Sequence, residues 1–271
     1  MIQHLIRPFL ASALFLASLL PAAAGSLDDV LQARILPGWR MADGTHMAAL
    51  EITLKPGWKT YWRAPGDLGI PPSFDWRGSG NLNGVEISWP TPKPLLQDGM
   101  LTIGYTDRVV LPLKVLPRRA GREIRLQGRL DLGVCHDVCI PMNLNIAAAL
   151  PSAAQKRDPR IAAALAEQPY SAKEARVSSV QCTLSPHADG LALRVDIRMP
   201  SAGGAEVVAI ETDNPQVWVA PARTSRKGGT LTVETRLEHV EGRSFALNRS
   251  AVRITVLGRS YGVDIQGCPA G

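Results

Sequence analysis

The sequence predicts an all-β protein made of two β-rich regions joined by one short helical segment. Short runs of apolar and β-branched residues alternate with clusters of Gly, Pro, Asn and Asp over most of the chain. A helical pattern occurs at one place only, near residue 160, and strand patterns return after residue 177. Because short strands at regular spacing between turn clusters are typical of sandwiches and barrels, we expect each region to adopt one of these architectures.

The first residues have the layout of a secretory signal peptide. Arg7 precedes an apolar run over residues 8–20, and a proline and three alanines then provide a small-residue cleavage site near Ala24. The run is shorter than the roughly 18 apolar residues that a membrane helix needs, and serines interrupt it. We therefore expect residues 1–24 to be removed and the mature protein to be periplasmic, without stable membrane insertion.

The first β-rich region is expected to span residues 25–150. Its clearest strand patterns cover residues 47–54, 84–89, 109–115 and 123–130. Each is rich in Val, Ile and Leu and is bounded by turn-forming residues, as strands are. The region is long enough for one sandwich domain.

A connector is expected over residues 151–175, followed by a second region over residues 176–271. Asp158 is a suitable N-cap, Pro159 fits the first helical turn, and Pro169 lies just beyond the helix-forming stretch. In the second region, strand patterns cover residues 191–197, 217–219, 230–235 and 251–257. This pattern predicts a second, smaller β-sandwich.

The charge distribution argues against nucleic-acid binding. The formal net charge is +6, and basic and acidic residues are interspersed. The densest basic stretch, residues 117–122, lies between two strand-like segments and contains no aromatic residue. A nucleic-acid interface would combine a basic stripe with stacking aromatics, so we expect no nucleic-acid partner.

The four cysteines allow three pairings, which differ in what a bond would contribute. Cys135 and Cys139 are close in sequence, whereas Cys182 and Cys268 lie near the two ends of the second region. A bond across the long loop would add roughly 4.6 kcal/mol of stability by loop-closure entropy, against about 2 kcal/mol for the short loop. Cys182–Cys268 is therefore the candidate structural disulfide.

The Cys135-x3-Cys139 pair is the candidate catalytic site for thiol–disulfide exchange, because a tight pair of little structural value tends to be labile or catalytic. His136 would lower a neighbouring thiol pKa and Asp137 would raise it, so no direction follows from them. A plain hairpin cross-link and a soft Cu(I) site with Met142 are alternatives. The spacing does not match haem attachment, and zinc would need further ligands, so we expect no resident metal or cofactor.

Large aromatic residues are concentrated just after the first predicted strand. Four of the six tryptophans fall between Trp58 and Trp89, and the densest run covers residues 55–76. Core and turn packing alone can account for such a cluster. The alternative is an aromatic surface beside a functional site.

Several motifs in the same order resemble one family. They are Gly57-Trp58-Lys59-Thr60-Tyr61-Trp62-Arg63-Ala64-Pro65-Gly66-Asp67, then Ile87-Ser88-Trp89-Pro90, then Ile103-Gly104-Tyr105, then Val138-Cys139-Ile140-Pro141. Together they are similar to the N-terminal periplasmic domain of DsbD-type membrane thiol reductases, especially its relative in the ScsB proteins of copper-stress systems. The resemblance covers residues 30–146, and the later β-rich region more loosely.

The resemblance implies an immunoglobulin-like sandwich in which Cys135 and Cys139 form the redox pair. Such a domain takes electrons from a membrane thiol reductase or another membrane-linked thioredoxin-like donor and passes them to oxidised periplasmic proteins. By position, Tyr61 and Trp62 match the aromatic segment beside the pair, and Tyr105 follows the loop that caps it. That loop would cover residues 95–103, where the aromatic cap of better-known relatives is absent.

The resemblance also favours Cys139, the more C-terminal cysteine, as the one that bonds to the partner. No multi-span membrane segment and no Cys-x-x-Cys module follow residue 150, so electrons are expected to come from a separate protein. Two other functions use the same residues differently. One is a periplasmic Cu(I)-binding protein of copper tolerance, and the other is a structural adaptor with two inert disulfides.

Overall fold

A computed structural model describes residues 30–66, 69–97 and 99–271. The expected signal peptide, residues 1–24, lies outside the described residues, as does Asp67 of the aromatic motif. No helix in the described part of the chain is long and apolar enough to cross a bilayer.

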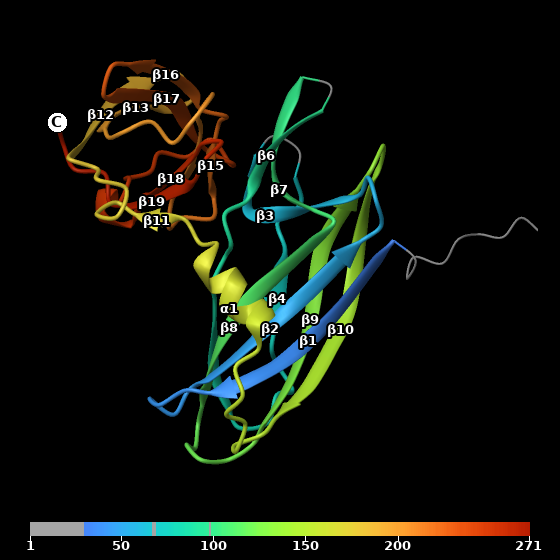
Figure 1. The fold of residues 1–271 in the computed structure, drawn as a ribbon. Helices are drawn as coiled ribbons and strands as arrows, with labels where there is room; N and C mark the ends of the chain where they lie inside the picture. Colours follow the sequence, from blue (N-terminus) through green and yellow to red (C-terminus); the bar gives the residue numbers. More distant parts are fainter. Residues whose placement is uncertain (1–29, 67–68, 98) are drawn as a thin grey trace, which may run out of the picture.

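The first sandwich consists of two antiparallel sheets that face each other (Figure 1). One sheet has the order β1-β2-β8-β5, with β1 (Leu31–Arg40), β2 (His46–Leu54), β8 (Arg108–Pro117) and β5 (Leu82–Ile87). The other has the order β10-β9-β3-β7-β6, with β10 (Cys139–Leu150), β9 (Ile124–Cys135), β3 (Lys59–Gly66), β7 (Met100–Thr106) and β6 (Lys93–Gln97), and β4 (Ser73–Asp75) pairs with β9. The fold is an immunoglobulin-like β-sandwich, as the sequence predicted.

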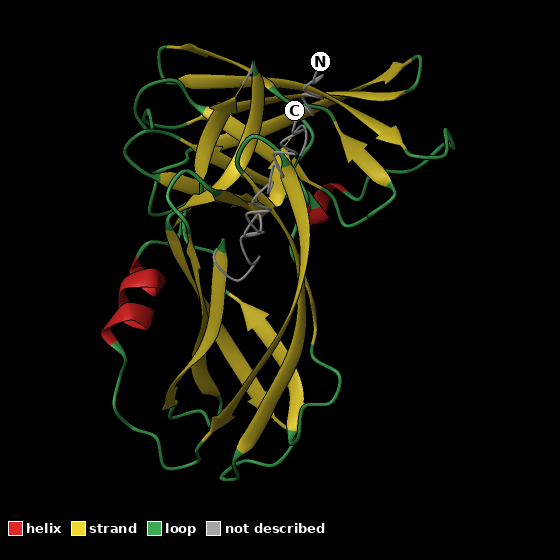
Figure 2. Cartoon of the chain, turned by 90° about the vertical axis from the view of Figure 1, so that its right-hand side faces the viewer, coloured by secondary structure: helices red, strands yellow, loops and turns green. Residues whose placement is uncertain are grey.

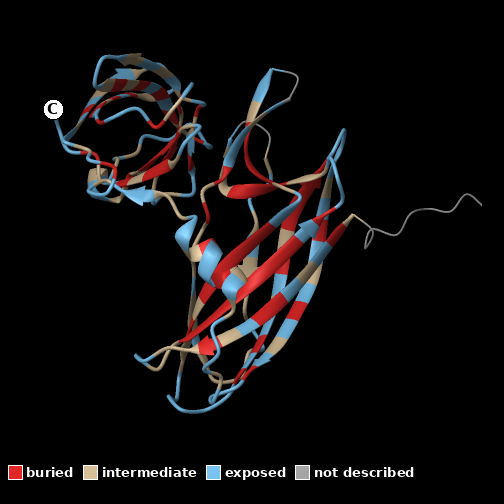
Figure 3. Ribbon diagram, in the orientation of Figure 1, coloured by how far each residue is buried: buried red, intermediate tan, exposed pale blue. Residues whose placement is uncertain are grey.

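Alternation along the strands builds the core of this sandwich. On β10, every second side chain points inward, and Met142, Ile146 and Leu150 are buried. They meet leucines of the opposite sheet such as Leu50 and Leu111, which are also buried. The inner faces are therefore apolar and buried, as the period of two dictates for a two-layer sandwich (Figure 3).

The helix α1 (Pro159–Ala166) covers part of the outer face of the β1-β2-β8-β5 sheet (Figure 1). The Asp158 side chain accepts a hydrogen bond from the backbone N–H of Arg160, so it caps the helix as predicted. Ile161 and Ala164 pack against Trp39 and other apolar side chains of β1, β2 and β8. The connector is thereby attached to the first sandwich.

The second sandwich is also built from two sheets (Figure 2). One has the order β11-β19-β18-β14, with β11 (Tyr170–Ser171), β19 (Gly262–Gln266), β18 (Arg253–Leu257) and β14 (Val207–Glu211). The other has the order β12-β13-β17-β15, with β12 (Ser179–His187), β13 (Gly190–Arg198), β17 (Thr230–His239) and β15 (Val217–Val219), and β16 (Arg223–Lys227) pairs with β17. A short 3-10 helix, Arg249–Ala251, precedes β18.

The two sandwiches are joined by polar and apolar contacts. Arg63 on β3 makes a bidentate ion pair with Glu211 on β14, at 2.9 and 3.0 Å. Ala209 and Leu257 of the second sandwich pack into the core of the first. Thr91 of the first sandwich bonds to the carbonyl oxygen of Glu167 at the end of α1. The ion pair fixes the second sandwich against β3, which pairs with β9, the strand that ends at Cys135.

Two details differ from the sequence-based expectation. The expected cap loop, residues 95–103, is instead a hairpin of β6 and β7, in which Leu95 pairs with Thr102 and Leu96 with Leu101. The sequence of β6 has no alternation of apolar and polar residues, so the local pattern did not indicate a strand or its partner. Within the expected connector, β11 joins the second sandwich by pairing with β19. The domain boundaries themselves stay a prediction.

Candidate redox site

The cysteine pair closes the tip of the β9–β10 hairpin. Cys135 is the last residue of β9, Cys139 is the first of β10, and the two are cross-strand partners joined by a disulfide. The three residues between them form the turn, in which the N–H of His136 bonds to the carbonyl oxygen of Val138 at 3.2 Å. The hairpin register therefore brings the two sulfurs together.

The two cysteines differ in their exposure. Cys135 is buried, with 1% of its surface exposed, whereas Cys139 is exposed. The neighbouring Val138 is 67% exposed, so one apolar side chain lies next to the accessible cysteine. An incoming sulfur would reach Cys139 more readily than Cys135.

Tyr61 is the side chain that contacts both sulfurs. Its hydroxyl donates a hydrogen bond to Cys135 Sγ at 2.8 Å and lies 3.3 Å from Cys139 Sγ. Burial raises the pKa of Tyr61 above its ordinary value, so the phenol stays protonated at neutral pH. Tyr61 is thus a fixed donor that can stabilise a thiolate after reduction.

A segment after β3 covers Tyr61, and sequence reasoning missed it. A Cβ on Gly69 would lie 2.8 Å from the Tyr61 ring and 2.1 Å from Pro65, so a glycine is required for this close packing. Ile70 packs in the same way on Gly133, two residues before Cys135. The signal in the sequence was the Pro- and Gly-rich composition of residues 65–72. The resemblance pointed instead to residues 95–103 as the segment that covers the site.

Trp62 and Tyr105 are not beside the sulfurs, contrary to the expectation from the resemblance. Trp62 is fully buried in the core, because neighbouring residues of a strand face opposite sides and Tyr61 takes the side of the cysteines. Tyr105 is also in the core, where its hydroxyl donates to the carbonyl oxygen of Pro90 at 2.8 Å. Both stabilise the sandwich beneath the site.

His136 and Asp137 contact each other at the surface of the turn. His136 Nδ1 lies 2.9 Å from Asp137 Oδ2, and the imidazole ring lies 5.7 Å from the ring of Trp58. His136 also packs over Gly57, where a Cβ would be 2.9 Å from its Nε2. Trp58 and Gly57 therefore position the turn, a role that the sequence alone did not assign to them.

The residues of the alternative copper site are not brought together. Met142 is buried in the core, on the face of β10 opposite to Cys139. In the described part of the chain, no group of three or more His, Cys, Asp or Glu side chains is arranged to hold a metal ion. A site built from both sulfurs and the Met142 thioether would need β10 to turn over.

Cys182 and Cys268 form the second disulfide, inside the core of the second sandwich. Both residues are 1% exposed. Arg249 donates hydrogen bonds from one guanidinium nitrogen to the carbonyl oxygens of both cysteines, at 3.0 and 3.3 Å. The bond joins β12 to the C-terminal segment of the chain and is shielded from solvent thiols.

Comparison with known proteins relates the first sandwich to a protein family. Residues 32–151 match the family model of the N-terminal domain of the thiol:disulfide interchange protein DsbD. These residues form a DsbD-like N-terminal domain. The DsbD-like domain contains the hairpin with Cys135 and Cys139, so the candidate site lies in the part of the chain that the family model covers.

The fold of most of the chain, including both sandwiches, is similar to that of a solved structure. The N-terminal periplasmic domain of ScsB from Proteus mirabilis superposes with a TM-score of 0.71 at 22% sequence identity, covering 90% of this chain and 95% of that chain. The likeness shows that the DsbD-like domain and the second sandwich share one overall fold with that domain. No curated protein sequence matches the chain.

Proposed function

We propose that the chain is a periplasmic protein-disulfide reductase that uses Cys135 and Cys139. It accepts electrons from a membrane-linked, thioredoxin-like donor and passes them to oxidised periplasmic proteins. The observation that carries the proposal is the hairpin-tip disulfide with one exposed sulfur, one buried sulfur and the Tyr61 hydroxyl in contact with both. The DsbD-like fold around this hairpin supports the assignment to thiol–disulfide exchange.

A purely structural role fits this disulfide poorly. The bonded residues are only four apart, so the loop-closure contribution to stability is about 2 kcal/mol. The register of twelve cross-strand pairs already holds the hairpin. Exposed disulfides of small structural value are typically the labile ones. The adaptor function, in which this bond is inert, therefore has less support.

The exchange reaction follows from the exposure difference. In the reduced protein, the Cys139 thiolate attacks one sulfur of a partner disulfide, which breaks that bond, releases a partner thiolate and forms a mixed disulfide. The Cys135 thiolate then attacks Cys139 Sγ, which releases the second partner thiolate and forms the Cys135–Cys139 bond. Two electrons pass to the partner, and the released thiolates take up protons from solvent.

Re-reduction is the same exchange in the opposite direction. A thiolate of the donor attacks Cys139, the accessible sulfur, and Cys135 leaves as a thiolate. The Tyr61 hydroxyl lies close enough to hydrogen-bond this leaving thiolate. Hydrogen bonds to charged groups are roughly twice as strong as neutral ones, so Tyr61 favours the step. The donor's second thiolate then resolves the mixed disulfide, and both cysteines of this protein are reduced.

The first experiment compares Cys135→Ser and Cys139→Ser in the mature protein. The Cys135→Ser variant keeps the attacking sulfur and lacks the resolving one, so it should accumulate a mixed disulfide with an oxidised model protein. The Cys139→Ser variant should form much less. Wild-type rates of partner reduction in the Cys139→Ser variant would end the proposal.

The second experiment measures the reduction potential of the pair in glutathione or dithiothreitol buffers. We expect a value between about −120 and −270 mV, the range of exchange proteins. A potential below about −300 mV would mark a structural cross-link and favour the adaptor. As a matched control, Met142→Leu should leave exchange unchanged, because the thioether lies in the core.

A further inference from the structure

A groove of about 1130 Å³ lies where the first sandwich, α1 and the second sandwich meet. Its walls come from residues 90–94 and 105–110, from one side of α1, and from the turn at residues 258–262. Thr91 lies at this junction. Its hydroxyl donates a hydrogen bond to the carbonyl oxygen of Glu167 at the end of α1, and a Cβ added to Gly262 would lie only 2.7 Å from the Thr91 side chain. The groove therefore exists only when the two sandwiches are docked.

The charged side chains that line the groove are mainly cationic. Lys93, Arg108, Arg160 and Arg259 line it, and Glu167 is the one acidic residue among the lining residues that the structure describes. The lining thus carries three more positive than negative charges. A concave surface of one sign attracts ligands of the opposite sign.

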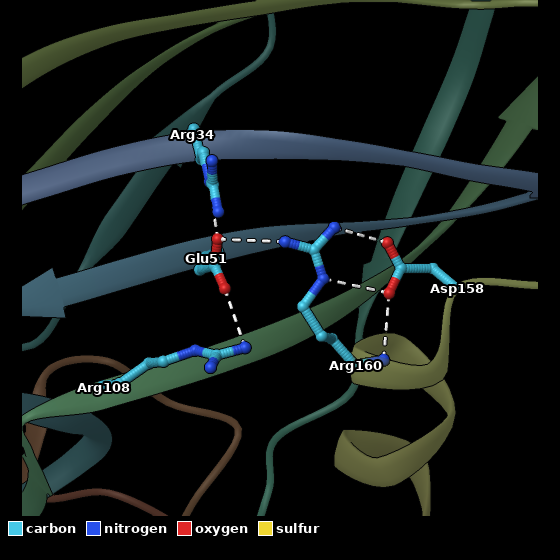
Figure 4. A network of polar contacts seen from close by, with 5 residues as sticks. All are labelled: Arg34, Glu51, Arg108, Asp158 and Arg160. Atoms are coloured by element: carbon cyan, nitrogen blue, oxygen red, sulfur yellow. Dashed lines mark hydrogen bonds and ion pairs between the residues drawn. The ribbon is translucent and has the colours of Figure 1, made fainter.

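Two of these arginines are held in place from below by a buried carboxylate (Figure 4). Glu51 on β2 is only 4% exposed. Its carboxylate forms an ion pair with Arg108 at 2.8 Å and a longer one with Arg160 at 3.6 Å. Arg34 binds the same carboxylate, and Asp158 holds Arg160 through two further bonds. Three guanidinium groups thus share two carboxylates, and their positions are set before any ligand arrives.

The remaining wall is aromatic and rich in proline. The rings of Tyr170 and Tyr261, from β11 and the turn before β19, lie 5.5 Å apart beside the groove. Pro90, Pro92 and Pro94 also line the groove and offer no backbone N–H. Such a wall provides apolar contact area and leaves polar recognition to the cationic side chains.

The dimensions favour a peptide over a small metabolite. The volume lies just above the roughly 300–1,000 Å³ typical of small-molecule clefts. The lining follows the eight residues of α1, a length of about 12 Å, which corresponds to about four residues of extended chain. We propose that this groove binds an extended acidic segment of a partner protein. The site goes beyond the exchange reaction, because it lies outside the cysteine pair and uses no thiol.

The test uses the oxidised mature protein and a fluorescein-labelled hexaglutamate peptide, with binding followed by fluorescence anisotropy at low salt. Lys93→Glu and Arg259→Glu reverse two lining charges that form no ion pair among the described residues, so their thermal unfolding should stay unchanged. Each should weaken binding at least fivefold. The matched control is Lys227→Glu on β16, which makes the same charge change away from the groove and should stay within twofold.

Three outcomes would overturn the proposal. Equal loss in Lys227→Glu would mean that only net charge matters. Equal binding of a hexalysine peptide would remove the charge argument. Competition by citrate at the same carboxylate concentration as the peptide would reassign the groove to a small anion. Peptide binding in this test involves no thiol. Absence of binding would therefore not contradict the proposed exchange function, and absence of exchange activity would not change the interpretation of the binding measurement.

Discussion

The two sandwiches each contain one disulfide, and the two bonds differ in every property that decides their chemistry. In the second sandwich, the bonded cysteines are 86 residues apart and both lie in the core. In the first, they are four residues apart at a hairpin tip, and one of them is exposed. The same covalent bond can therefore serve as a cross-link or as an exchange centre, according to loop length and access.

The comparison extends to the surroundings of the sulfurs. Arg249 binds the backbone carbonyls of Cys182 and Cys268, so its contacts would survive reduction and do not favour a thiolate. Tyr61 instead contacts the sulfur atoms of the other pair directly. A donor aimed at sulfur becomes stronger when the sulfur is charged, which is what an exchange centre needs.

The largest effect is expected from removing the long-range disulfide. Replacing Cys182 and Cys268 together with alanine should lower the free energy of unfolding by about 4.6 kcal/mol, because an 86-residue separation leaves a long loop open in the unfolded chain. The matched double variant of Cys135 and Cys139 should lose only about 2 kcal/mol. Urea unfolding of both variants measures the difference. Equal losses would remove the distinction between the two bonds.

A smaller effect is expected at the ion pair that joins the sandwiches. Glu211→Gln leaves Arg63 without its carboxylate partner. The loss matters because both side chains are largely buried, Arg63 with 16% and Glu211 with 22% exposure. Breaking a fully buried pair costs 3–5 kcal/mol, so we expect about 2 kcal/mol here. Trp218 is the one tryptophan of the second sandwich. In a Trp218→Phe background, tryptophan fluorescence therefore reports unfolding of the first sandwich alone and shows whether that sandwich still unfolds in one transition.

The control for that experiment is Glu234→Gln, which breaks the exposed pair with Arg194 on the second sandwich. Exposed pairs contribute at most about 1 kcal/mol, so stability should barely change. If Glu211→Gln behaves like this control, the ion pair does not couple the two sandwiches.

The smallest effect is expected from Tyr61→Phe, which removes only the hydroxyl next to the sulfurs. Losing a hydrogen bond that favours the reduced form by about 1 kcal/mol should make the reduction potential about 20 mV more negative. Because burial raises the pKa of Tyr61, the phenol stays protonated between about pH 6 and pH 9, so any change of this difference with pH should follow the cysteine thiols and not Tyr61. Equal potentials for Tyr61→Phe and the wild type throughout this range would show that Tyr61 is not the donor.

The sequence by itself determined the strand-rich architecture, the capped helix and the cysteine pair. These features are local: Asp158 caps α1 through its own neighbours, and alternation on β10 is visible in the residues themselves. The small value of a four-residue cross-link also follows from spacing alone. The motifs from Trp58 to Pro141 indicated the DsbD-like domain that the family model matches over residues 32–151.

Only the tertiary structure decided which residues surround the sulfurs. Tyr61 and Trp62 are adjacent in sequence, and the strand sends one to the cysteines and the other to the core. Ile70 reaches Gly133 and Arg63 reaches Glu211 across long stretches of chain, and no periodic pattern encodes such contacts. The reason is physical: local patterns fix which face a residue takes, whereas its partner depends on how the sheets pair and pack.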